Sequence, residues 1–346
     1  MIGRAVRRAH IVLMIPFSVL DLAPIVEGGD VAQALANSAD LAKHAERLGY
    51  RRIWLAEHHN MPGIASSATA LAIMNVAAAT KSIRVGAGGV MLPNHAPLII
   101  AEQFGTLEAL FPGRIDLGLG RAPGTDQRTA MALRRTLVGG EDRFPRDVVE
   151  LQALLGPAEP GQLVRAVPGE NAKVPLWILG SSLFGGQLAA MLGLPFAFAS
   201  HFAPAQMMDA IAIYRHTFKP SEQLDKPYVM LGYNVFAGDS DAAGRTLATS
   251  MMQSFVALRR GAPQLLPAPD PDFEAKMTEA EKAQLQGVRA CSAIGSGATV
   301  KAAIADFIAR TRADELIIAS HIYDHSARVR SYEIAADIGQ QLRRAG

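Results

Sequence analysis

Short apolar runs of strand length alternate along the chain with longer runs whose apolar residues recur every three or four positions. The first pattern is typical of buried strands, and the second predicts helices that pack one face onto a sheet. Strands are predicted at residues 10–17, 51–57, 83–92, 113–120, 174–181, 195–200, 226–238 and 314–322. Helices are predicted at residues 31–50, 66–81, 97–111, 126–137, 144–155, 185–193, 204–218, 241–260, 298–311 and 325–344. These repeated strand–helix units indicate an α/β fold with a parallel sheet.

Two helix ends carry local signals. Gly49 follows the first helical run and is expected to be its C-cap, because glycine adopts the left-handed backbone readily. Ser66 or Ser67 precedes the second helical run and is expected to be its N-cap, with the hydroxyl accepting a backbone N–H.

Parallel units of this kind either close into a barrel or spread into a doubly wound sheet. A barrel carries its functional residues after several different strands, because its site lies at the carboxyl ends of the strands. A dinucleotide-binding sheet instead concentrates its glycines after the first strand, and no such fingerprint is present here. Chemically distinctive residues lie at or near the carboxyl ends of six predicted strands, at 57–60, 88–89, 118–121, 180–182, 200–201 and 320–321. The pattern predicts a (β/α)8 TIM barrel.

Composition narrows the class of protein. The 346 residues are 49% hydrophobic and 19% charged, which is enough apolar material for one large domain spanning 1–346. The net charge of +2 is spread thinly, which argues against a nucleic-acid-binding surface. The one cysteine, Cys291, excludes an internal disulfide. Residues 11–20 are apolar but too few to cross a membrane, so we interpret them as a first core strand rather than a signal peptide and expect a cytoplasmic protein.

The residues toward the carboxyl ends of the third, fourth and fifth predicted strands suggest a ligand site. Ser181 and Ser182 lie in the glycine-rich stretch 180–186 at a strand-to-helix junction, where hydroxyl and N–H groups can hold a phosphate. Arg121 would add a charged donor. The doublet Gly88-Gly89 would let a flat ring approach the backbone. A planar, phosphate-bearing ligand fits these features, although the 180–186 stretch alone is equally compatible with an ordinary turn.

Three stretches, residues 54–60 (WLAEHHN), 85–121 and 174–202, resemble the bacterial luciferase-like flavin-dependent monooxygenases. The resemblance runs in order along nearly the whole chain. The tail at 320–336 is similar to that of single-subunit, non-luminescent members. The resemblance implies a (β/α)8 barrel that binds FMN, or in some branches the deazaflavin F420, at the carboxyl ends of its strands.

Individual positions follow from this resemblance. His58 falls on the family's active-site histidine beside the reactive carbon of the flavin, and His59 falls on its neighbour. Gly88-Gly89 falls where the family often has a non-prolyl cis peptide against the isoalloxazine ring. Arg121 and Ser181 fall on phosphate contacts. The remaining implied cofactor-binding residues are Gly120, Gly180, Ser182, Phe184 and Gly185, with Ser182 to Gly185 supplying backbone N–H groups.

Gly120 is a departure from one branch of the family. It stands where light-emitting luciferases carry a cysteine near the flavin, which argues against bioluminescence.

The resemblance implies a monooxygenase that uses reduced FMN and O2 to oxygenate a small organic substrate. No nicotinamide motif is evident, so a separate NAD(P)H:flavin reductase is expected to supply the reduced FMN. An imidazole, whose pKa is about 6.5, suits proton transfer beside a flavin, and Glu57 is expected to fix its tautomer or orientation. Two alternatives stay open: an F420- or FMN-linked dehydrogenase on the same fold, and a non-catalytic flavin-binding protein.

Other polar residues have less specific interpretations. A His-His pair also occurs in metal sites, but no third ligand follows at a spacing such as H-E-x-x-H, so no metal is expected. His201 either lines the substrate side of the pocket or caps a strand end. The polar residues within 321–325 are expected to be structural at the barrel rim. Arg114 and Asp116 are expected to form a structural ion pair.

Two features concern larger segments. Residues 261–290 lack a strand and interrupt the alternation, and by resemblance we interpret them as a mobile lid over the site, with a plain surface excursion as the alternative. The helical stretches 66–80 and 97–110 are apolar around most of their circumference, which predicts a homodimer that buries them.

Overall fold

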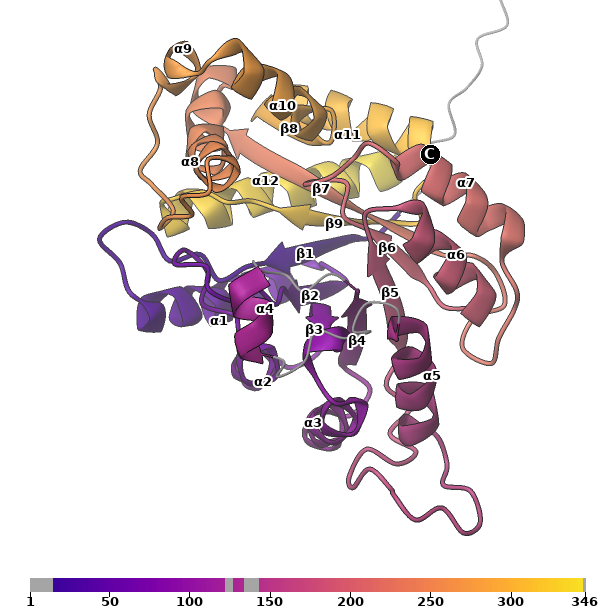
Figure 1. Cartoon of the computed structure of the whole chain (residues 1–346). Coiled ribbons are helices and arrows are strands. Elements are labelled where there is room, and N and C mark those ends of the chain that lie inside the picture. The colour runs from indigo at the N-terminus through magenta and orange to yellow at the C-terminus, as the bar shows by residue number, and fades with distance from the viewer. Residues whose placement is uncertain (1–14, 122–126, 134–142, 345–346) are drawn as a thin grey trace, which may run out of the picture.

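A closed barrel of parallel strands forms the centre of the computed structural model, which describes residues 15–121, 127–133 and 143–344 (Figure 1). The barrel strands are β1 (Phe17–Asp21), β2 (Arg52–Leu55), β3 (Arg84–Met91), β4 (Ile115–Gly120), β5 (Leu176–Gly180), β6 (Phe196–Phe198), β7 (Val229–Gly238) and β9 (Glu315–Ala319). Neighbours pair in parallel from β1 to β7, β7 pairs with β9, and β9 closes the ring onto β1. The predicted (β/α)8 fold is confirmed.

Helices surround the barrel and connect its strands (Figure 1). Those in the first half of the chain are α1 (Val31–Leu48), α2 (Thr69–Ala79), the 3-10 turn η1 (Leu92–Asn94), α3 (Pro97–Leu110), α4 (Gln127–Leu133) and α5 (Phe144–Leu155). Those in the second half are α6 (Leu183–Leu192), α7 (Met207–Thr217), α8 (Asp241–Arg259), α9 (Phe273–Lys276), α10 (Glu279–Arg289), α11 (Gly297–Thr311) and α12 (His325–Arg344). None of the helices within the described ranges is long and apolar enough to cross a membrane.

The first strand lies later in the sequence than its apolar pattern suggested. The prediction placed it at 10–17, of which 10–14 lie outside the described residues, whereas β1 spans Phe17–Asp21. The apolar run continues to Leu20, and a continuous run gives no signal for where pairing starts. The register is fixed instead by the neighbouring strands, since Val19 lies opposite Ile53 of β2 and Ile318 of β9.

Helix capping confirms one expectation and corrects another. Gly49 ends α1 in the left-handed conformation, with φ of 79°, and its N–H reaches the carbonyls of Ala45 and Glu46. The N-cap of α2 is Ala68, without a side-chain cap, so the expectation for Ser66 or Ser67 was wrong. Both hydroxyls are used elsewhere: they donate to the carbonyls of Ala56 and His58, in the segment after β2.

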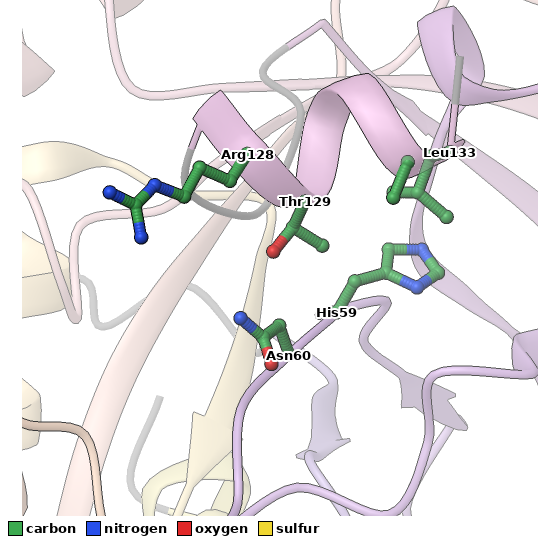
Figure 2. A pocket seen from close by; sticks show the side chains of 6 residues that line it. His59, Asn60, Arg128, Thr129 and Leu133 are labelled. Carbon is green, nitrogen blue, oxygen red and sulfur yellow. The ribbon is translucent and has the colours of Figure 1, made fainter. Parts of the chain in front are cut away.

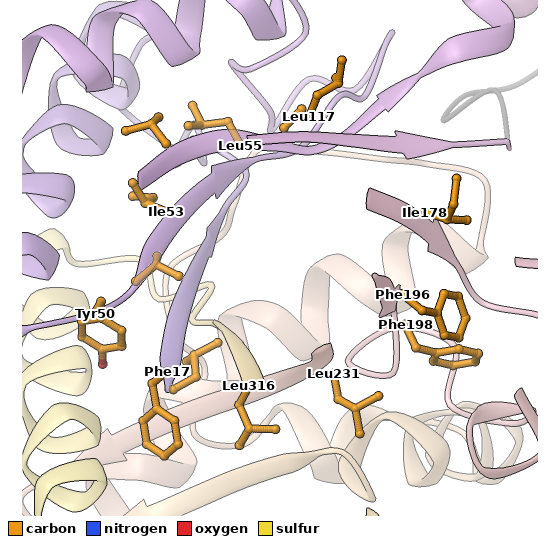
Figure 3. Close-up of a cluster of buried hydrophobic side chains, with 14 of the residues drawn as sticks. Phe17, Tyr50, Ile53, Leu55, Leu117, Ile178, Phe196, Phe198, Leu231 and Leu316 are labelled. Carbon is orange, nitrogen blue, oxygen red and sulfur yellow. The ribbon is translucent and has the colours of Figure 1, made fainter. Parts of the chain in front are cut away.

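Strand alternation separates two apolar layers. Outward residues of the strands pack against the helices in the larger cluster, part of which Figure 3 shows, including Ile53 and Leu55 of β2. Inward residues fill the barrel with a smaller cluster that includes Trp54, Ala56, Trp177, Met230 and Ile317. The two layers follow from the alternation of side chains along each strand.

Charged residues close the amino-terminal end of the barrel. The guanidinium of Arg52 donates to Asp116 at 2.6 Å and to Glu315 at 2.9 Å, and all three side chains are buried. Arg84 also pairs with Asp116. The expected pair of Arg114 with Asp116 was wrong: Arg114 instead donates to the carbonyls of Ile83, Ala77 and Thr80 and to the Thr80 hydroxyl.

The segment 261–290 lacks a strand, as predicted, but it contains the helices α9 and α10. Its chain pairs with the loop after β1, where Leu266 donates to the carbonyl of Ile25 at 2.8 Å and accepts from Glu27 at 2.9 Å. Residues of α10 pack with α8 in a separate apolar cluster. A ninth strand that the sequence did not predict, β8 (Ser292–Ser296), follows and pairs in parallel with the last half of β7.

Candidate active site

The stretch after β2 distributes its side chains between two neighbourhoods. Trp54 and Ala56 point into the barrel, and β2 ends at Leu55, so contacts rather than strand alternation place the residues that follow. His58 acts electrostatically on His201 and His321, which follow β6 and β9, and so lies on the inner side of the mouth, whereas Glu57 contacts His59 and His95 in a separate group. Adjacent histidines therefore serve different parts of the rim.

Glu57 is the centre of a hydrogen-bonded group. Its Oε1 lies 2.8 Å from Nε2 of His59 and 2.9 Å from Nε2 of His95, and its Oε2 accepts the N–H of Met91 at 3.1 Å. The carboxylate is 1% exposed, so these contacts replace its hydration. Burial raises the pKa of Glu57, but the hydrogen bond and charge of His95, followed by the bonds from His59 and Met91, hold the net pKa below its usual range.

His95 was not identified from the sequence. It follows β3 by way of η1, whereas the two histidines recognised in the motif follow β2. Only the pairing of β2 with β3 brings the three side chains together. Its position after a strand, at the same rim as the other candidates, was the signal available in the sequence.

Three imidazoles gather at the inner side of the mouth. Burial, and then the charges of His321 and His58, lower the pKa of His201 to about 4. Burial, and then Arg328, also lower the pKa of His321 to about 4, against the opposing effect of Asp21. Both rings are therefore neutral at pH 7, and Nδ1 of His201 and Nε2 of His321 are buried without a hydrogen-bond partner among the described residues. Such atoms are suited to receive a polar group of a ligand.

A pocket of about 470 Å³ opens beside this rim. His59 and Asn60 line it from the segment after β2, and Arg128, Thr129 and Leu133 line it from α4 (Figure 2). The volume lies in the range of small-molecule sites. His59 thus both contacts the carboxylate of Glu57 and lines the pocket.

The glycine doublet forms part of the barrel wall. The Gly88-Gly89 peptide is cis, at the point where the register between β3 and β4 shifts. A Cβ on Gly88 would lie 2.9 Å from Leu20 and 3.0 Å from Trp54, and a Cβ on Gly89 would lie 2.7 Å from the carbonyl of Gly118. Glycine is therefore required here by packing.

Arg121 and the loop after β5 are brought together. The guanidinium of Arg121 stacks over the ring of Phe184, with 4.3 Å to the centroid. Ser182 is the N-cap of α6 and forms no side-chain cap hydrogen bond. A Cβ on Gly180 would lie 3.3 Å from the Cα of Gly185, so the loop is folded tightly with Ser181 at its turn. A cationic side chain beside a helix N-terminus provides the donors that an anion requires.

The remaining candidates have contacts of their own. A Cβ on Gly120 would lie 2.8 Å from Sδ of Met91, so a larger residue would displace that side chain. His201 packs against Gly232, and its carbonyl accepts from Asn234 at 2.8 Å. His325 pairs with Asp40 and Tyr323 donates to the carbonyl of Glu27, which agrees with structural roles at the rim.

A closed parallel barrel with its candidate residues at the carboxyl ends of the strands defines a (β/α)8 barrel protein. The chain belongs to the luciferase-like monooxygenase family, whose model matches residues 15–315. A relative described as a luciferase-like monooxygenase from Escherichia coli (strain K12) is 52% identical over 328 residues, which cover 95% of this chain and 98% of the relative. Membership supports a monooxygenase, and hence an oxidoreductase, in general terms.

Solved structures agree with this fold. The crystal structure of apo-MsnO8 has a TM-score of 0.87 and 34% identity, covering 94% of this chain and 98% of the other. The oxygenating constituent of 3,6-diketocamphane monooxygenase from Pseudomonas putida, in complex with FMN, has a TM-score of 0.70 and 17% identity, covering 94% and 97%. An F420-dependent secondary alcohol dehydrogenase has a TM-score of 0.66 and 15% identity, covering 93% and 98%.

Proposed function

We propose that the chain is an FMN-dependent monooxygenase that takes reduced FMN from a separate NAD(P)H:flavin reductase. The observation that carries this proposal is the grouping of Arg121, Phe184 and the N-terminus of α6 beside the glycine wall of β3. The Cβ position of Gly89 lies 3.0 Å from Leu179 of β5, so the wall and the phosphate-type site belong to one contiguous rim.

The residues present fit a flavin mononucleotide. Arg121, Ser181 and the N–H groups of residues 182–185 would hold the phosphate, and Gly88-Gly89 would flank the ring. When bound, reduced FMN supplies the electrons with which O2 is activated to oxygenate the substrate. The inward imidazole of His58 would hold or move a proton beside the ring, and neutral His201 and His321 would contact the substrate's polar group.

Cofactor binding tests this proposal at the phosphate. The chain should bind reduced FMN more tightly than F420 in anaerobic titrations followed by flavin fluorescence or absorbance. Replacing Arg121 with methionine (R121M) should weaken FMN binding about 10- to 100-fold, because a hydrogen bond to a charged group contributes about 1.5–3 kcal/mol.

Riboflavin, which has the same ring but no phosphate, provides the matched ligand control. R121M should change riboflavin affinity by no more than about twofold, which is well below the loss of about tenfold or more expected for FMN. An exposed arginine paired with Glu170 provides the control variant, R165A, which should bind both flavins normally. Equal losses for FMN and riboflavin would contradict the phosphate role. Tighter binding of F420 would favour a hydride-transfer enzyme instead.

A further inference from the structure

The imidazole of His201 occupies space that a glycine on β7 leaves free. Gly232 lies opposite Ile317 of β9, whose side chain points into the barrel, so a Cβ on Gly232 would also point inward. That Cβ would lie 2.1 Å from Nδ1 of His201 and 3.0 Å from its Cε1 and Cγ. The ring of His201 therefore rests directly on the strand, at the inner side of the mouth.

Two buried side chains hold the backbone around His201 against β7. The pairing of β6 with β7 ends at Phe198. Beyond this point the Ser200 hydroxyl donates to the carbonyl of Gly232 at 2.7 Å. The side-chain amide of Asn234 donates to the carbonyl of His201 at 2.8 Å. These bonds continue the contact with β7 where the strand pairing ends, so the backbone as well as the ring fixes the position of His201.

The two ring nitrogens of His201 have different surroundings. Nδ1 is buried and has no hydrogen-bond partner among the described residues, whereas Nε2 is not buried. The ring is neutral at pH 7, because burial, and then the charges of His321 and His58, lower its pKa to about 4. A neutral imidazole carries one proton, and buried N–H groups without an acceptor are rare in proteins. The proton therefore belongs on Nε2, which becomes a donor at the mouth.

The groups around this donor favour an uncharged acceptor. Met230, the preceding inward residue of β7, is apolar, and the imidazole of His321 is neutral at pH 7. Arg328, the cation that acts on His321, is already paired with Asp21. A carboxylate bound here would lose hydration without gaining a counter-charge from these groups, whereas a carbonyl or other neutral oxygen needs only the N–H.

We propose that His201 is a specificity-determining residue whose Nε2–H donates to an uncharged oxygen acceptor of the substrate, and that Gly232 is the positioning residue that gives its ring room on the barrel wall. The substrate role rests on the proposed flavin-dependent function. The position and tautomer of His201 do not, since they exist in the protein without flavin.

The direct test is NMR of 15N-histidine-labelled, flavin-free protein, with an H201Q variant to assign the His201 signals. In the wild type, His201 should be the neutral Nε2–H tautomer and should titrate near pH 4. In G232A the ring should be displaced, and its pKa should rise toward 6.5 as burial is lost. A wild-type His201 protonated on Nδ1, or His201 signals unchanged in G232A, would overturn the proposal.

A glycine elsewhere provides the matched control. A Cβ on Gly297 of α11 would lie 3.4 Å from Ile334, which is an ordinary contact, so G297A should leave the His201 signals unchanged. A change in G297A as large as that in G232A would show a general disturbance of the fold and would overturn the specific role of Gly232.

Unfolding measurements separate the ring from the strand. G232A should lower the folding equilibrium constant by about 5- to 100-fold, as overpacking does, and by much less in an H201A background, where the ring is absent. If G232A alone does not fold, recovery of folding in the G232A/H201A double variant supports the proposal. Equal losses in the two backgrounds, or failure of both variants to fold, would contradict it.

Three probes of similar size test the class of acceptor in the flavin-free protein. Acetophenone, which carries a carbonyl oxygen, should shift the Nε2–H signal of His201. Ethylbenzene, which has no acceptor, should leave the signal in place, and benzoate should act more weakly than acetophenone. No shift with acetophenone, an equal shift with ethylbenzene, or a stronger effect of benzoate would overturn the donor role.

The outcome for the proposed function is separate. A protein that shows the expected His201 tautomer and acetophenone response, but no flavin-dependent turnover, would contradict the proposed function and leave the recognition role of His201 standing. Flavin-dependent turnover with an unchanged His201 in G232A would have the opposite meaning.

Discussion

At the scale of single residues, the members of the Glu57–His58–His59 motif have different neighbours. His58 acts on the buried imidazoles of His201 and His321, whereas Glu57 contacts His59 and His95. The resemblance points to His58 as the active-site histidine, which stays a prediction, and the geometry adds that Glu57 contacts both His59 and His95. His95 could not be assigned from one sequence, because its contact depends on strand pairing and not on spacing along the chain.

The buried histidines predict a specific dependence of stability on pH. The pKa of His321 is about 4 in the folded protein and 6.5 without burial, so the unfolded chain binds more protons between these values. Stability should therefore fall as pH decreases from 6.5 toward 4. Replacing His321 with glutamine (H321Q) should flatten this slope, by up to about 3 kcal/mol at the acid end.

Urea unfolding at several pH values would measure this effect. The H216Q variant, which changes an exposed histidine of α7, serves as the control and should retain the wild-type slope. An H321Q slope equal to that of the wild type would contradict the assignment of His321 as a buried neutral imidazole.

The ion network at the amino-terminal end predicts a large effect on stability. Replacing Arg52 with methionine (R52M) leaves Asp116 and Glu315 buried with fewer counter-charges, and it should lower the free energy of unfolding by about 3–5 kcal/mol. The exposed pair of Arg310 with Asp306 offers a comparison, since R310A should change stability by only about 0.5 kcal/mol. Similar effects of the two variants in chemical unfolding would refute the structural role of the network.

At the scale of elements, the strands and helices of the barrel were predictable because their apolar periods differ. β8 was not, because its sequence SAIGS is short and only partly apolar, and it forms by pairing with the extended end of β7. The helices α9 and α10 lie in a stretch rich in proline and charge, where α10 is stabilised by a capping box of Thr278 and Glu281. A capping box of this kind can be recognised from the sequence, whereas the pairing of β8 with β7 depends on the whole fold.

The segment 261–290 is expected to act as a lid whose anchor is Leu266. This side chain is 4% exposed, and its backbone pairs with the loop after β1. The L266A variant should loosen the anchor and increase the rate of proteolytic cleavage within 261–290 by up to about 30- to 150-fold, because about 2–3 kcal/mol of packing is lost. Bound FMN should slow cleavage in the wild type. Cleavage that is insensitive to both flavin and L266A would favour a plain surface excursion.

At the scale of the whole molecule, α2 and α3 present apolar side chains on the outside of the barrel. Leu71 and Met74 of α2 are 64% and 41% exposed, and Ile99 and Leu110 of α3 are 50% and 56% exposed. Both helices are also apolar on their inner faces, where Ile73, Val76 and Phe104 are buried. A second copy of the chain is the occupant we expect for this surface.

Charged substitutions on the apolar surface of α2 and α3 test the expected dimer. A double variant with lysine at Leu71 and Ile99 should be monomeric in analytical ultracentrifugation at a concentration where the wild type is dimeric. Leu163, which is 98% exposed at a distance along the chain from these helices, provides the control L163K, expected to remain dimeric. A wild type that is monomeric at high concentration would contradict the expectation.

The central claim is that the protein binds reduced FMN at the barrel mouth and uses it to activate O2 for oxygenation of a substrate. The most direct measurement mixes the anaerobic complex of reduced FMN and protein with O2 and follows flavin absorbance in a stopped-flow instrument. The proposed function predicts that the protein changes the course of flavin oxidation, with an O2-dependent transient that the H58A variant alters in lifetime. Oxidation with the same time course as free reduced FMN, or no binding of reduced FMN, would contradict it.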